Sequence, residues 1–258
     1  MEPIIVFITL LAFLVGSALA AIVGLGGGII YTPLMLTLGY DLIGTVLPVS
    51  LFLIFATSFT AAISYYRQGL VDVRLSALVG LAAGVGAPIG AKIALILPEL
   101  YFVLILSSVI TFTAIKLLLN IRKNGAAVSP ESSAPYKPPP AWFGLLLGVA
   151  ASTIAALLGV GGGLIIVPAL IFAGLSPKKA VGTASGAMIL ISSFGFAAHL
   201  PSAKFNFALL PIPAAVVLGG AFIGAKVISP RVKPVYIQIA LAIIMLLVMS
   251  RLLLNVLL

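Results

Sequence analysis

Long stretches of this chain contain no charged residue, and their length restricts what the chain can fold into. Residues 4–23 and 234–249 are two of these stretches. A helix needs about 20 apolar residues to cross the roughly 30 Å hydrocarbon core of a bilayer, whereas a barrel strand needs about ten. Only 7% of the residues are charged, while a soluble domain carries roughly 25%. The sequence therefore predicts an all-α integral membrane protein that has the lipid bilayer as a partner.

The charged residues exclude several classes of function. The formal net charge is +9, but the fourteen Lys and Arg lie between apolar stretches and not along one polar face, so no nucleic-acid partner is expected. The chain has no cysteine, one histidine and five carboxylates. This composition offers neither a metal site nor a nucleophile with its base. We predict no enzyme activity, no catalytic residue, no metal and no cofactor.

Two apolar blocks are separated by a polar linker. Residues 121–140 are rich in Ser, Pro and charge, which is typical of an exposed linker, and they divide the chain into membrane repeats at 1–120 and 141–258. Each block contains a Gly-x-Gly-Gly-Gly motif, at residues 24–28 and 159–163, and the two motifs are 135 positions apart. Further matches follow in the same order, which indicates an internal repeat.

Each block divides into five apolar segments, and the second segment is short in both. An odd number of crossings puts the two ends of a block on opposite sides of the membrane, so the repeats should be inverted. Lys and Arg accumulate in cytoplasmic loops, and eleven of the fourteen fall inside if the N-terminus is outside. We expect extracytoplasmic termini and a cytoplasmic linker. Eight crossings, with the glycine segments as re-entrant excursions, would spoil this alternation. The ten predicted segments are 4–23, 27–38, 43–64, 75–97, 101–120, 142–157, 162–174, 181–199, 206–228 and 234–257.

The glycine motifs interrupt apolar stretches at the depth of a span, where an unsatisfied backbone group costs several kcal/mol. We interpret each motif as the break of a discontinuous helix whose short second piece begins at the glycines. The N–H groups and the positive dipole end of such a helix start can hold an anion without a buried lysine. The alternative is that the glycines only allow close helix packing. The six candidate ligand residues are Gly26, Gly27, Gly28, Gly161, Gly162 and Gly163.

Hydroxyl side chains begin the segment after each break. Thr45 and Ser50 occupy this place in the first repeat, and Thr183 and Ser185 in the second, with Thr45 and Thr183 138 positions apart. These four hydroxyls are predicted to donate hydrogen bonds to the oxygen atoms of a bound anion. The alternative is that each bonds a backbone carbonyl of its own helix.

The remaining polar residues argue against a cation as the substrate. All five acids map to segment ends or loops, whereas cation carriers keep carboxylates at membrane depth. Lys92 and Lys226 close the fourth segments, where they either extend to the interface or attract the substrate. His199 ends a predicted span, and an interfacial place is favoured for it over a role in proton coupling.

Each of the two Gly-x-Gly-Gly-Gly motifs is followed by a proline. With this doubled motif the sequence resembles the TauE/SafE sulfite exporter family, also called the 4-toluene sulfonate uptake permease family. The Gly-Thr pairs at residues 44–45 and 182–183 and the Gly-Ala-Lys triplets at 90–92 and 224–226 extend the likeness over nearly the whole chain outside the linker. The resemblance implies a multi-pass carrier in a bacterial or archaeal inner membrane that moves sulfite, a sulfonate or another organosulfur anion. We expect a secondary transporter that works by alternating access, or alternatively an anion channel that uses the same helix ends.

Overall fold

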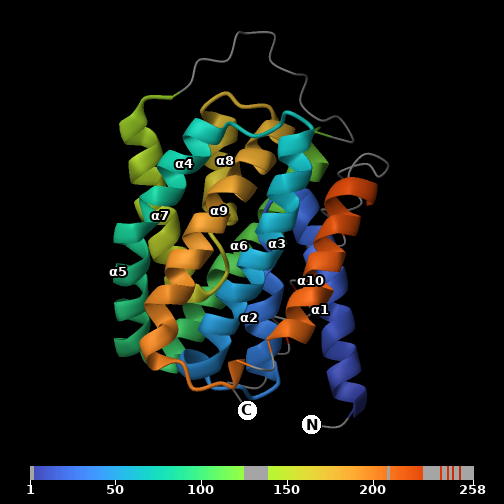
Figure 1. Ribbon diagram of the computed structural model, residues 1–258, viewed down its shortest axis with the longest axis vertical. Helices are drawn as coiled ribbons and strands as arrows, with labels where there is room; N and C mark the ends of the chain where they lie inside the picture. The colour runs from blue at the N-terminus through green and yellow to red at the C-terminus, as the bar shows by residue number, and fades with distance from the viewer. Residues whose placement is uncertain are drawn as a thin grey trace.

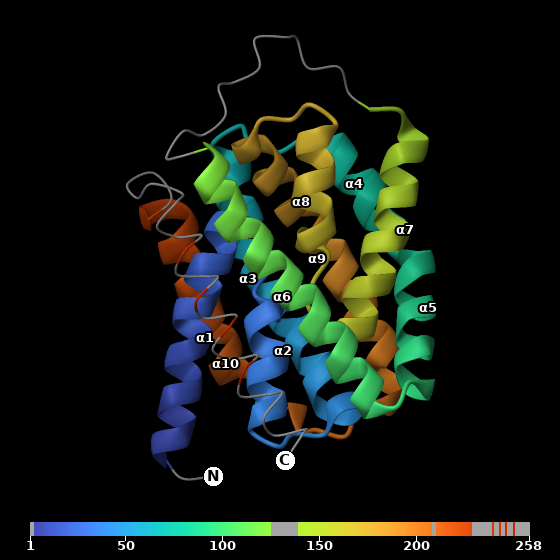
Figure 2. The same ribbon diagram turned by 180° about the vertical axis from the view of Figure 1, so that it is seen from behind.

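A computed structural model describes residues 3–124, 139–207 and 210–228, together with four single positions at 239, 243, 246 and 250. Every regular element within these ranges is a helix (Figures 1 and 2), which confirms the predicted all-α class. Most of the predicted linker and nearly all of the predicted tenth segment lie outside the described residues.

Helices fill most of the predicted first repeat. A four-residue break separates the long α1 from the short α2, and a π-helical turn, η1, leads directly into α3. The elements are α1 (Pro3–Val23), α2 (Gly28–Thr37), η1 (Leu42–Val46), α3 (Leu47–Arg67), α4 (Val73–Leu81), α5 (Ala83–Ile96) and α6 (Glu99–Asn124).

The second repeat follows the same order of long, short and long helices. A break again separates its first two helices, and a π-helical turn, η4, extends its last described helix. The elements are α7 (Ala141–Leu158), α8 (Gly163–Phe172), α9 (Pro177–His199), η2 (Leu200–Ser202), α10 (Pro211–Phe222) and η4 (Ile223–Ile228).

Four described helices are long and apolar enough to cross a membrane, and the bent pair α4–α5 makes a fifth candidate if it is one span. The four are Ile4–Val23, Leu42–Arg67, Ala141–Leu158 and Pro177–Ser202. The predicted fourth segment, 75–97, is not one straight helix, because α4 and α5 meet at an angle of 41°. Gly80 and Gly84 flank this bend, and glycine weakens a helix at such a point.

Helices of the two repeats pack on one another in a pattern that occurs twice. The fourth segment of each repeat packs against the first helix of the other, so that α5 lies against α7 and α10 lies against α1. Both views in Figures 1 and 2 show these two pairs at opposite sides of the molecule. Likewise α4 packs on α9 and α10 packs on α3, while α3 and α9 contact each other at the centre.

Small residues allow the close approach within these pairs. A Cβ atom added to Gly86 would collide with Ser152, and one added to Gly220 would collide with Ser17. Ser17 and Ser152 are 135 positions apart, and Gly86 and Gly220 are 134 apart. These fourth-segment glycines are therefore packing positions.

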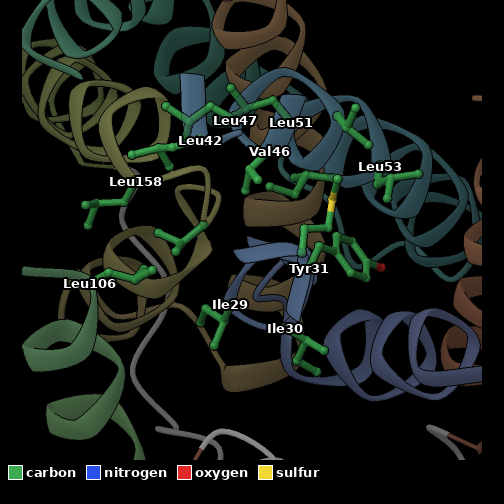
Figure 3. Close-up of a cluster of buried hydrophobic side chains, with 14 of the residues drawn as sticks. Ile29, Ile30, Tyr31, Leu42, Val46, Leu47, Leu51, Leu53, Leu106 and Leu158 are labelled. Atoms are coloured by element: carbon green, nitrogen blue, oxygen red, sulfur yellow. The ribbon is translucent and has the colours of Figure 1, made fainter. Parts of the chain in front are cut away.

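The largest buried apolar cluster surrounds α2. Figure 3 shows Ile29, Ile30 and Tyr31 of this helix among side chains from α3, α6 and α7, such as Leu106 and Leu158. Large apolar side chains also remain on the outer surface, with Phe172 88% exposed. An outer surface of this kind suits lipid and not water.

Candidate anion site at the two helix breaks

The first break runs from Gly24 to Gly27, between α1 and α2. Gly24, Gly26 and Gly27 have φ angles of 76°, 76° and 85°, which side chains other than glycine's rarely tolerate. Within the described residues, the backbone N–H groups of Gly26, Gly27 and Gly28 donate to no backbone carbonyl. Three donors are therefore left at the start of α2, as an anion site of this type requires.

The second break resembles the first but is not identical to it. Gly159 and Gly161 have positive φ angles of 64° and 80°, whereas Gly162 has a φ of −77° and is helical. In the part of the chain that the structure describes, the N–H groups of Gly161, Gly162 and Gly163 also donate to no backbone carbonyl. Gly28, Gly162 and Gly163 are the members of the two motifs without a positive φ. Of these three, Gly162 is the one whose added Cβ would not collide with the backbone of the opposite break.

The two breaks face each other. Gly28 lies directly against the carbonyl oxygen of Gly159, and Gly163 lies directly against the carbonyl oxygen of Gly24, since an added Cβ would collide at both places. Ile54 lines the first contact and Met188 lines the second. The contacts are reciprocal at offsets of 134 and 135 positions, so each break meets the other through matching positions of the two motifs.

This relation differs from the match that the sequence suggested. Leu47 contacts Gly159, and Val181 contacts Gly24. Leu47 and Val181, which are 134 positions apart, are therefore equivalent residues at the two breaks. Thr45 and Thr183, which are 138 positions apart, are therefore not equivalent at the breaks. The π-helical turn η1, which contains Thr45, precedes α3 and accounts for the one additional residue between Gly28 and Leu47.

Two side chains hold the carbonyl groups that the breaks leave without a helical partner. Tyr65 Oη donates to the Ala21 carbonyl at 3.0 Å, and His199 Nε2 lies 2.8 Å from the Ala156 carbonyl. Because a carbonyl oxygen only accepts, Nε2 carries the proton in the second contact. His199 is 0% exposed, so its side chain is packed inside the protein.

Ser50 is the predicted hydroxyl that the structure places at a break and leaves free. Its side chain is fully buried and lies beside Gly159, and its Oγ has no hydrogen-bond partner among the described residues. Thr32, which the sequence analysis did not single out, donates from Oγ1 to the Gly159 carbonyl at 2.6 Å. A buried hydroxyl without a partner is costly, so a ligand oxygen beside Ser50 would remove a penalty.

The other predicted hydroxyls have different surroundings. Thr45 is half-buried in η1. Thr183 Oγ1 accepts from the Asp72 N–H at 3.0 Å, which ties α9 to the start of α4. Ser185 Oγ donates to the Val181 carbonyl at 2.8 Å, so it follows the alternative in which a hydroxyl bonds its own helix.

Tyr31 also lies at the first break, and like Thr32 it was not among the site residues predicted from the sequence. Its ring lies over Gly27, and its Oη is 2.9 Å from Thr57 Oγ1. Thr57 uses its own proton to reach the Leu53 carbonyl, so Tyr31 is the donor. The second repeat has Ile166 and Ile191 at the corresponding positions. Tyr31 and Thr57 therefore have no polar counterpart in the second half of the chain.

Comparison with known proteins finds one matching family profile and several similar membrane proteins. The profile described as "Sulfite exporter TauE/SafE" matches residues 8–252 of the chain. The chain is 28% identical over 222 residues to "Probable membrane transporter protein YdhB" of Bacillus subtilis (strain 168), covering 85% of this chain and 88% of the relative. "Probable membrane transporter protein YunE" of the same organism is 27% identical over 86% of this chain and 85% of its own length. "Probable membrane transporter protein MJ0441" of Methanocaldococcus jannaschii is 23% identical, with 92% and 90% covered. No solved structure matches the chain significantly.

Proposed function

Because the chain belongs to the sulfite exporter TauE/SafE family, which makes it a membrane transporter, we propose that it is a secondary carrier for a small anion. The proposed substrate is sulfite, a sulfonate or a related organosulfur anion, and the proposed mechanism is alternating access. The observation that carries this proposal is the pair of opposed breaks, each with unpaired backbone N–H groups at a helix start.

The proposed architecture has ten transmembrane segments in two inverted repeats. The reciprocal contacts of the breaks support it, and so does the grouping of charged loops. The Asp72 N–H bonds Thr183, which brings the α3–α4 and α8–α9 connections to one end of the molecule (Figure 1). Arg67, Arg74 and Lys178 flank these connections, since Arg67 ends α3 and the other two lie in the first turns of α4 and α9. We therefore assign this end to the cytoplasm and the opposite end, with the N-terminus, to the outside.

The proposed site lies between the breaks. The N–H groups of residues 26–28 and 161–163 and the hydroxyl of Ser50 supply hydrogen-bond donors. No Lys or Arg is among the buried residues of the described chain, so the positive ends of α2 and α8 provide the favourable potential. In this structure each helix start lies against a carbonyl of the opposite break. Binding therefore requires these contacts to open, and we propose that this opening accompanies the change of access.

The decisive experiment uses Gly162→Ala. An added Cβ there would lie 3.0 Å from the end of the Ile166 side chain and 3.3 Å from Ala151 and Ile191. Its φ is negative and the nearest neighbour is the flexible end of a side chain, so the fold should tolerate the methyl group. The N–H groups beside it would become less accessible to an anion. We expect binding of sulfite or methanesulfonate, measured by calorimetry, to weaken at least tenfold.

The matched control is Gly219→Ala, since no atom of the described residues lies within 4 Å of the Cβ position at Gly219. Ser50→Ala tests the hydroxyl, and loss of one hydrogen bond to a charged group should weaken binding about tenfold or more. Sulfate and acetate define the class of anion. Unchanged affinity in folded Gly162→Ala and Ser50→Ala would refute the site between the breaks.

An anion channel is the alternative that uses the same helix ends. The close contacts between the breaks favour a carrier, because a conducting pore needs a continuous opening. Proteoliposomes separate the two: a carrier shows saturable uptake of radiolabelled sulfite and no unitary current in a planar bilayer. Stepwise conductance that does not saturate would instead establish a channel.

A further inference from the structure

A groove of about 350 Å³ runs along the surface between α3 and the α10–η4 segment, away from the two breaks. Its walls carry apolar side chains, among which Phe59, Ile63 and Phe222 are 45%, 39% and 46% exposed. These three side chains and Leu218 line the groove. The apolar part of the groove therefore suits a hydrocarbon chain.

One end of the groove carries two cations. Arg67 ends α3 and Lys226 lies on η4, and both line the groove. Lys226 Nζ is 4.9 Å from the centre of the Phe222 ring, which holds the ammonium group over the groove. Among the residues that the structure describes, neither Asp nor Glu lines the groove, so the described part of the chain does not neutralise the positive charge at this end.

The other polar groups of the groove are already occupied. Thr60 Oγ1 donates to the Ala56 carbonyl, Ser64 Oγ donates to the Thr60 carbonyl and Gln68 Nε2 donates to the Ser64 carbonyl. Because these groups bond their own helix, the groove has few free donors besides the two cations. A long apolar wall with a purely cationic end does not suit a small polar solute.

We propose that this groove binds one anionic phospholipid, with an acyl chain along the apolar wall and the phosphate between Arg67 and Lys226. Lys and Arg near a membrane surface attract anionic lipid in this way. The second repeat does not reproduce the site, because Pro201 stands at the position 134 residues after Arg67. The cationic pair is therefore not a by-product of the repeated fold. The lipid would lie between α3 of one repeat and α10 of the other.

Lipid titration of the purified full-length protein by native mass spectrometry tests this proposal. The variants are Arg67→Gln, Lys226→Gln and the double variant, and the control is Lys92→Gln, which removes the equivalent lysine of the other repeat. Dioleoyl phosphatidylglycerol should bind the parent more tightly than dioleoyl phosphatidylcholine. Each groove variant should weaken phosphatidylglycerol binding about fivefold, from about 1 kcal/mol per cation near anionic lipid, and the double variant should weaken it further.

Three outcomes would overturn the proposal. Equal binding of phosphatidylglycerol to the parent and the double variant would show that the cations do not hold the headgroup. Equal weakening by Lys92→Gln would show a general charge effect. Full competition by inorganic phosphate at the same concentration as lipid would show a free-anion site and not a lipid site.

Discussion

Replacing Gly28 by alanine should loosen the contact between the two breaks. The new Cβ would collide with the Gly159 carbonyl oxygen and would lie 2.7 Å from the carbonyl carbon of Val160. Both are backbone atoms of the opposite repeat, so neither can turn aside as a flexible side chain would. Gly28 is not among the glycines with positive φ, so the cost arises from crowding and not from backbone strain.

The size of the effect follows from overpacking in a well-packed interior, which typically costs about 1–3 kcal/mol. Gly163→Ala should behave alike, because its Cβ would collide with the Gly24 carbonyl and lie 2.9 Å from Leu25 Cα. Gly219→Ala is the control, since its Cβ meets no atom within 4 Å. Alanine is favoured over glycine in a helix by up to about 1 kcal/mol, so the control should equal or exceed the parent in stability.

Thermal unfolding of the purified variants in one detergent measures these effects. A loss of 1 kcal/mol lowers the Tm of a chain of this size by about 2–4 °C, so each break variant should unfold several degrees below the parent. Because both substitutions separate the same pair of breaks, the double variant should lose less than the sum of the single losses. If Gly28→Ala and Gly163→Ala both unfold at the temperature of the parent, the breaks are not in contact as described.

Two further predictions concern the carbonyl contacts and the topology. Tyr65→Phe leaves the buried Ala21 carbonyl without a donor and should cost about 1 kcal/mol or more of unfolding free energy. His199→Gln keeps a donor and should therefore cost less unfolding free energy than His199→Leu. Equal losses for the two His199 variants in thermal unfolding would contradict the assigned contact with Ala156. The chain has no native cysteine, so Ser132→Cys should remain unlabelled by a membrane-impermeant maleimide in intact cells, and labelling from outside would exclude a cytoplasmic linker.

The apolar segments could be predicted from the sequence because their signal is local. The uncharged stretch at 4–23 and the glycines after it determine where α1 ends, and Pro3–Val23 agrees with that prediction. The bend between α4 and α5 was not predicted, because the apolar composition of residues 75–97 is continuous through it. Hydropathy records the length of a segment and not its direction.

The arrangement of the site could be predicted only in part. The motifs at 24–28 and 159–163 indicate two breaks, and the positive φ angles agree with this interpretation. Their mutual contact depends on residues more than 100 positions apart, and one sequence does not reveal such pairs. Tyr65 and His199 perform the same task with different chemistry, so no repeated letter in the sequence marks them.

The packing of α10 on α1 and of α5 on α7 has a consequence for the origin of such a chain. Each repeat leaves one face of its first helix to be covered by the fourth segment of the other repeat. A gene for one repeat alone would therefore yield a protein that covers this face only by exchanging segments with a second copy. Gene duplication and fusion would then have converted an obligatory pair of chains into one. By the same reasoning, the two repeats of this protein, if synthesised as separate polypeptides, should accumulate only when both are present in the same membrane.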